Sequence, residues 1–230
     1  FKSNGIKLVA EKIETYEEYR KFKDMGFDYF QGYFLAKPEI VRHRKIGPSG
    51  LTMMQLLTLS SQPKLNFDEV NKIIERDPSL TYLLLRFINN PLVNKRHKIT
   101  SLKHALTFMG EVEVKKFISL LALANLNEGQ PTELMQMALV RAKFCELVYT
   151  QIHPNDNPLT GFLTGLLSLL DAMMEQSIED LVSKVPISDA VKDALCGQPG
   201  LLRNCLTLTQ YFERAKWAGI QQFSAKYDLK

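Results

Sequence analysis

The feature that most constrains the fold is the spacing of apolar residues from about residue 50 to the end of the chain. These residues recur at steps of three and four, which is the period of one face of an α-helix. Leu80, Leu83, Leu84 and Phe87 form one such stripe. Because roughly 180 residues of helix can bury a substantial core, we predict an all-α domain here.

Capping residues divide this part of the chain into helices. Asn66 and Asp77 are expected N-caps, and a proline follows Asp77 at the first helical position. Thr100 or Ser101 is expected to cap a further helix that Gly110 ends. The same periodicity predicts helices over 111–127, 131–152, 157–176, 177–185 and 188–197, and one long final segment from about 200 to 227.

The beginning of the chain has a different pattern. Residues 6–10 are typical of a short β-strand, Thr15 of an N-cap and Gly26 of a helix stop, and residues 28–35 of a second strand. Two strands joined by a helix normally pair in parallel through a right-handed crossover. We therefore predict one β-α-β unit.

The second strand carries a polar side chain in an apolar setting. Alternation places Gln31 between Tyr29 and Tyr33 on one face of the strand. A buried amide must find hydrogen-bond partners. We therefore expect Gln31 to be buried, either as a structural hydrogen bonder or as a residue that binds something polar.

Two strands bury too little to stand as a domain. Residues 39–50 contain two glycines and a proline in a polar setting, which is typical of a linker. We therefore divide the chain into a fragment over 1–38, a linker over 39–50 and a helical domain over 51–230.

Composition limits the class of protein. The net charge of +4 is mild and the basic runs are short, so nucleic-acid binding is not favoured. No apolar run reaches the roughly 18 residues that span a bilayer. The three cysteines, Cys145, Cys196 and Cys205, form no CxxC motif, and their odd number predicts reduced thiols in the cytoplasm.

Residues 8–38, "LVAEKIETYEEYRKFKDMGFDYFQGYFLAKP", resemble the C-terminal end of an EAL domain. That family is a TIM-type barrel that hydrolyses the bacterial messenger cyclic di-GMP, and its last strands typically read AEGVET and G-x-DYxQGYxxxxP. The resemblance matches Glu11 to the family's glutamate and Gln31 to its glutamine, which flank a metal-dependent phosphodiester site.

This EAL remnant departs from the family pattern. Lys12 stands where the family has glycine. The Glu-Ala-Leu signature, the metal-binding acidic residues and the lysine of the middle strands are absent from this chain. Two-metal phosphodiester chemistry needs several carboxylates. We therefore expect no cofactor in this chain, and Mg²⁺ or Mn²⁺ only if a full-length EAL domain is active.

Most of residues 50–230 resemble an HDOD domain, a helical relative of the HD phosphohydrolases found in bacterial signalling proteins. The motifs are "IIERDPSLTYLLLRFINNP", "ITSLKHALTFMG" and "GFLTGLLSLLDAM". An EAL domain followed by an HDOD domain is a known architecture. The resemblance thus implies a mainly α, HD-like bundle preceded by a β-α-β fragment of an EAL barrel.

The resemblance also locates a degenerate metal site. HD phosphohydrolases carry "GLLHDIG", and this chain has "GLLSLLD", so Ser168 and Leu169 fall at the His-Asp positions. Leucine cannot ligate a metal and a serine hydroxyl is a poor ligand. Asp171 follows Leu169 by two residues, which is about 200° around a helix, so we do not expect it to face the same place. The histidines form no i, i+4 metal pair; they are His43, His97, His104 and His153.

With no catalytic site expected in the helical domain, we expect it to act by binding a partner. Its methionine-rich runs suit either the core or an adaptable groove for a protein partner. Arg86, Asn89 and Asn90 either fix the end of a helix or face a shared pocket. We predict a non-catalytic interaction module in cyclic di-GMP signalling; the alternative is a cyclic di-GMP phosphodiesterase that the HDOD domain regulates in the full-length chain.

Overall fold

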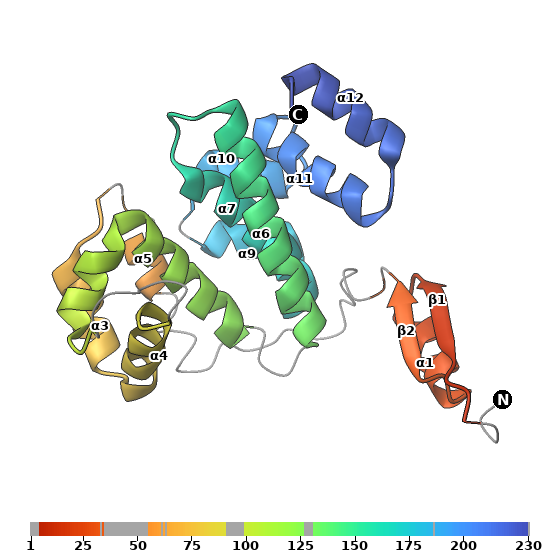
Figure 1. The fold of residues 1–230 in the computed structure, drawn as a ribbon, viewed down its shortest axis with the longest axis horizontal. Helices are drawn as coiled ribbons and strands as arrows, with labels where there is room; N and C mark the ends of the chain where they lie inside the picture. Colours follow the sequence, from red (N-terminus) through yellow and green to blue (C-terminus); the bar gives the residue numbers. More distant parts are fainter. Residues whose placement is uncertain are drawn as a thin grey trace.

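The structure is a computed structural model that describes residues 5–32, 34, 55–60, 62, 64–90, 99–126, 131–185 and 187–229. Within these ranges the chain forms one small sheet near the N-terminus and helices elsewhere (Figure 1). The predicted mainly α fold with a preceding β-α-β fragment is confirmed. Among the described helices, none is both long and apolar enough to cross a membrane.

The N-terminal fragment consists of β1 (Val9–Ile13), α1 (Tyr16–Asp24) and β2 (Tyr29–Gly32). The strands are parallel, as predicted, although β1 begins later than the expected residues 6–10. Thr15 caps α1 through a capping box, in which its hydroxyl accepts from the Glu18 N–H at 3.2 Å. Local side-chain chemistry thus sets the start of this helix.

One face of the sheet packs on α1 and the other does not. Ala10, Ile13 and Phe34 are buried against aromatic side chains of α1 and its flanking loops. Gln31 is exposed, so the expectation of a buried amide is wrong. The reason is that alternation places Gln31 on the face of β2 that α1 leaves uncovered.

The first helices of the helical domain are a segment at 55–60, α3 (Phe67–Glu75) and α4 (Pro78–Ile88). The predicted caps are confirmed: the Asn66 side chain accepts from the Glu69 N–H at 3.2 Å, and Asp77 accepts from the N–H of Ser79 at 2.9 Å and of Leu80 at 3.3 Å. The helix boundaries therefore follow from local sequence.

The stripe expected on α4 is only half right. Leu80 and Leu84 are buried, but Leu83 is 41% exposed and Phe87 is 38% exposed. The third core residue is Ile88 instead. A stripe at steps of four therefore faces the core, because only one side of α4 is covered.

The helix α5 (Leu102–Leu126) links two hydrophobic cores. Gly110, at φ 77° and ψ 169°, breaks it as predicted, because this left-handed φ favours glycine. After this kink, Val114 to Ala122 pack with α3 and α4, whereas Leu123 belongs to the core around α6 and α7. A buried ion pair, Lys116 with Glu146 at 2.9 Å, also joins α5 to α6.

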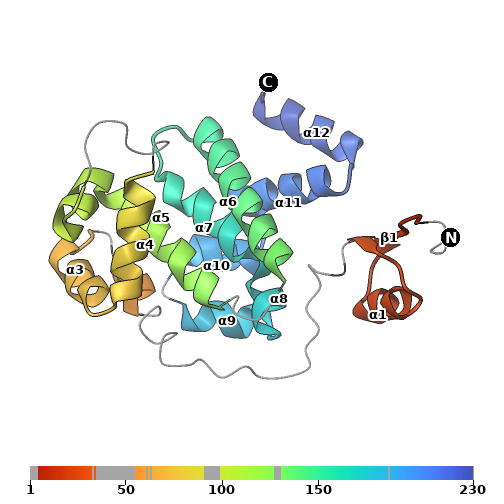
Figure 2. The ribbon, with the colours of Figure 1, turned by 60° about the horizontal axis from the view of Figure 1, so that its bottom comes forward.

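The second core is built on α6 (Thr132–Ile152) and α7 (Pro158–Leu166), which lie side by side in both views (Figures 1 and 2). The elements that follow are the 3₁₀ turn Leu167–Leu169, α8 (Leu170–Met174), α9 (Ile178–Lys184), α10 (Asp189–Leu195), α11 (Leu201–Glu213) and α12 (Trp217–Tyr227).

Two predicted long helices are broken. The segment expected over 157–176 divides at the 3₁₀ turn, where Leu169 has non-helical angles of φ −121° and ψ 14°. The final segment divides between α11 and α12, where Ala215 has φ 51°. Apolar periodicity continues across both breaks, so the pattern alone does not reveal them.

Candidate functional site

The two residues matched to the EAL site lie on neighbouring strands. Gln31 is in β2, and Glu11 is in β1 at an irregularity between the pairs Ala10–Phe30 and Ile13–Gly32. Both side chains are exposed, and alternation places both on the face away from α1. Together they offer one carboxylate and one amide, which do not fit the several carboxylates that two metal ions require.

The polar residues at the end of α4 have different surroundings. Asn89 uses its whole amide: its nitrogen donates to the carbonyl oxygens of Leu85 at 2.8 Å and Ile99 at 2.7 Å, and its oxygen accepts from the Ile99 N–H at 2.8 Å. Arg86 and Asn90 are exposed. Asn89 therefore ties the chain at Ile99 to the end of α4.

Replacing Asn89 with alanine is expected to lower the free energy of unfolding by about 2 kcal/mol, because the N–H and C=O of the buried Ile99 lose their partners. Urea unfolding measures this. The control is Arg86→Ala on the same helix, which we expect to change stability by less than about 0.5 kcal/mol, as is usual at exposed positions. Equal effects of the two substitutions would contradict the assignment.

The degenerate HD positions lie in the 3₁₀ turn that directly follows a close approach of α7 to α6. A Cβ at Gly165 would clash with the backbone carbonyl of Arg141, and a Cβ at Gly161 would approach the Cys145 carbonyl oxygen to 2.8 Å. Only glycine permits this approach. As a result, Ser168, one turn after Gly165, meets the side chain of Arg141 on α6.

Arg141 forms a buried network at this point. Its side chain is 1% exposed, and it donates through Nε and Nη2 to the two carboxylate oxygens of Glu213 on α11, each at 2.7 Å. Its Nη1 donates to the hydroxyl of Ser168 at 3.1 Å, and that hydroxyl donates to the Gly165 carbonyl at 2.8 Å. We call Arg141, Glu213 and Ser168 the arginine cluster.

The other two residues of the "GLLSLLD" motif have different environments. Leu169 is 1% exposed and belongs to the core. Asp171 is half-buried in the first turn of α8, where its carboxylate accepts from the Ala172 N–H at 2.8 Å. Burial raises the pKa of the Asp171 carboxyl, and this hydrogen bond and the charge of Arg141 oppose the rise only in part.

The raised pKa has a consequence for stability. Because the folded state disfavours ionised Asp171, the carboxylate costs stability at neutral pH, and this cost disappears as pH falls below the carboxyl's ordinary pKa of about 3.9. Asp171→Asn is therefore expected to raise the urea midpoint at pH 7 and to raise it less at pH 4. A gain that is independent of pH would contradict this account.

Within the described ranges, no group of three His, Cys, Asp or Glu residues lies close enough together to hold a metal ion. His104 is exposed on α5. His153 lies beyond the end of α6, with its Nδ1 3.8 Å from a carboxylate oxygen of Asp156. His43 and His97 lie outside the described residues.

Sequence analysis missed Arg141 and Glu213. A signal was present, since Ala138, Arg141, Ala142 and Cys145 share one helical face, and the apolar members of that stripe predict a buried arginine. The partner was not predictable in this way, because Glu213 comes from the end of a helix 72 residues further along.

Comparisons with known proteins agree with this architecture. The family model for the HDOD domain matches residues 49–185, and the model for the EAL domain matches residues 1–38. No solved structure matches the chain.

Two curated proteins are similar along almost the whole chain. "Cyclic di-GMP phosphodiesterase CdgJ" of Vibrio cholerae is 37% identical over 216 residues, which are 94% of this chain and 50% of that protein. "Uncharacterized protein YuxH" of Bacillus subtilis is 31% identical over 227 residues, 97% of this chain and 55% of that protein. The chain thus spans about half the length of these relatives. It belongs to the HDOD domain family, with the end of an EAL domain before the HDOD domain.

Proposed function

We propose that the helical domain is a non-catalytic interaction module of a bacterial cyclic di-GMP signalling protein. It would pass a signal between a protein partner and the EAL domain whose end precedes it. The observation that carries the proposal is the arginine cluster: a buried guanidinium donates to Ser168, at the position where the HD resemblance expects a metal ligand.

A guanidinium at this place opposes metal binding in two ways. Arg141 is always charged at physiological pH, so a divalent cation beside Ser168 would meet a buried positive charge with little water to screen it. The carboxylate of the arginine cluster, that of Glu213, already holds Arg141 through both of its oxygens. Leu169 contributes only an aliphatic side chain.

The second candidate function is hydrolysis of cyclic di-GMP by the full-length protein, with the HDOD domain as regulator. It is supported by the relative from Vibrio cholerae, which bears the name of a cyclic di-GMP phosphodiesterase. Glu11 and Gln31, adjacent on one face of the sheet, are the residues of this chain that would border such a site. In such a full-length protein, barrel residues outside this chain would bind the Mg²⁺ or Mn²⁺.

A hydrolysis assay separates the two candidates. The 230-residue chain and the full-length protein are each incubated with cyclic di-GMP and Mg²⁺ or Mn²⁺, and the linear product is measured; a binding titration accompanies each assay. We expect no product from the chain alone. Product from the full-length protein would establish the second candidate, and product from the chain alone would overturn the proposal for the helical domain.

A further inference from the structure

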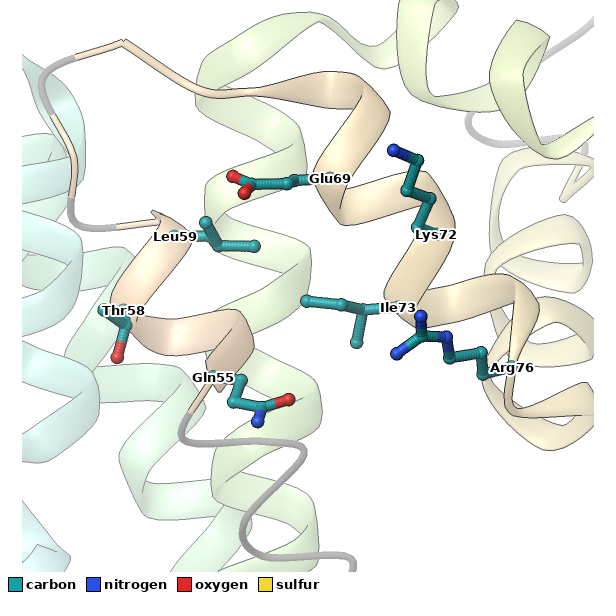
Figure 3. Close-up of a pocket in the computed structure, with 7 residues that line it drawn as sticks. All are labelled: Gln55, Thr58, Leu59, Glu69, Lys72, Ile73 and Arg76. Carbon is teal, nitrogen blue, oxygen red and sulfur yellow. The ribbon is translucent and has the colours of Figure 1, made fainter.

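A pocket lined by apolar and charged side chains lies between the helical segment 55–60 and α3. Its volume is about 410 Å³. Figure 3 shows Leu59 and Ile73 facing each other across it from the two helices. An apolar space of this size with a few polar groups at its edges is the usual form of a small-molecule site.

The polar groups are arranged by charge along α3. Glu69 lies at one end, Lys72 near it, and Arg76 at the other end, with Ile73 between them (Figure 3). Arg76 follows Glu69 by seven positions, which corresponds to about 10 Å along the helix axis. Gln55 and Thr58 supply an amide and a hydroxyl from the opposite wall. The pocket therefore has an acidic end and a basic end.

Among the described residues, these three charges have no partner. Within the described ranges, the side chains of Glu69, Lys72 and Arg76 form no ion pair and no hydrogen bond, although Glu69 and Lys72 are one turn apart. By contrast, the neighbouring Asp68 is paired with Lys103 at 3.4 Å. No partner that the structure describes therefore occupies the three charged side chains that line the pocket.

This order of groups selects a particular chemistry. A carboxylate accepts two parallel hydrogen bonds from a group with two adjacent N–H donors, and an arginine donates two to a phosphate. A planar ring between the two fits the apolar walls. Guanine presents adjacent N–H donors on its Watson–Crick edge, whereas the same edge of adenine presents a donor beside an acceptor.

We propose that this pocket binds a guanine nucleotide, with the base edge at Glu69 and the phosphate at Arg76. Leu59 and Ile73 cover the base. The HDOD domain would thus sense a nucleotide directly. This goes beyond the role of an interaction module and does not depend on the state of the metal site.

The test is isothermal titration of the 230-residue chain with GMP, AMP, cyclic di-GMP and inorganic phosphate. We expect GMP to bind at least about tenfold more tightly than AMP, the discrimination that one bidentate contact provides. Inorganic phosphate should bind much more weakly than GMP. Equal binding of GMP and AMP, binding of phosphate as tight as that of GMP, or no binding of GMP at millimolar concentration would each overturn the proposal.

Variants locate the site. Glu69→Gln should abolish the preference for GMP over AMP, and Arg76→Gln should weaken the binding of GMP about tenfold, the loss of a bidentate phosphate contact. Glu75→Gln and Lys184→Gln remove matched charges from exposed positions outside the pocket and should leave affinity unchanged. Equal losses in the controls would indicate non-specific charge effects and would contradict the site. GMP binding that Glu69→Gln and Arg76→Gln both leave intact would place the nucleotide elsewhere and would overturn the proposal.

Discussion

Replacing Glu213 with alanine is expected to lower the free energy of unfolding by about 3–5 kcal/mol. The substitution removes the counter-charge and two carboxylate hydrogen bonds of a guanidinium that is 1% exposed, and removing one partner of a buried ion pair is strongly destabilising. Urea unfolding monitored by circular dichroism gives the value. A loss below about 1 kcal/mol would mean that the arginine cluster does not hold α6 and α11 together.

A double substitution tests whether the charge itself is the cause. Arg141→Met with Glu213→Leu removes both partners and keeps side chains of similar volume. Buried ion pairs replaced in this way are often neutral or stabilising. We therefore expect the double variant to be clearly more stable than Glu213→Ala alone. If the two are equally unstable, lost packing at Glu213 and not the unpaired charge explains the effect.

Replacing Gly165 with alanine is expected to cost up to about 3 kcal/mol, at the upper end of the range for overpacking. The added methyl group would meet the backbone carbonyl of Arg141, and a backbone cannot move aside as a flexible side chain can. The helices α6 and α7 would have to separate, and this would also draw Ser168 away from Arg141. Thermal or urea unfolding measures the loss.

The control for this prediction is Gly200→Ala. A Cβ at Gly200 would have no atom within 4 Å, and its φ of 168° is extended backbone that any residue adopts. We expect a change of less than about 0.5 kcal/mol. If both glycine substitutions had the same small effect, the close approach of α6 and α7 would not be a requirement of the fold.

The sequence predicted the helix starts well because they are determined locally. Thr15, Asn66 and Asp77 each hydrogen-bond a backbone N–H two or three residues further on, and such contacts depend on no other part of the chain. Gly110 is similar, because a left-handed φ is a local property. The order of helices follows from these signals and from apolar spacing.

Features that depend on distant residues were predicted poorly. The 3₁₀ turn after α7 and the break near Ala215 occur inside periodic apolar patterns, so periodicity predicted continuous helices. On α4, the core used Ile88 where the stripe predicted Phe87, because the position of neighbouring helices decides which side of a helix is covered.

The candidate site shows the same division. The motif comparison predicted, from the sequence alone, that Ser168 and Leu169 do not ligate a metal. It gave no indication that Arg141 would reach Ser168, since that contact needs two glycines on α7 and a carboxylate from α11. The positions of Ser168 and Leu169 were thus predicted from the sequence, and the partners that the fold brings to Ser168, Arg141 and through it Glu213, were not.

The measurement that tests the central claim most directly is a thermal-shift titration of the 230-residue chain with Mn²⁺ and with Mg²⁺. A ligand at 100 times its dissociation constant stabilises the folded state by about 2.7 kcal/mol, which shifts the melting temperature by several degrees. Because Arg141 stands at Ser168, we predict no saturable shift up to millimolar metal. A saturable rise in melting temperature that Ser168→Ala removes would show a metal site at this position and would contradict the account.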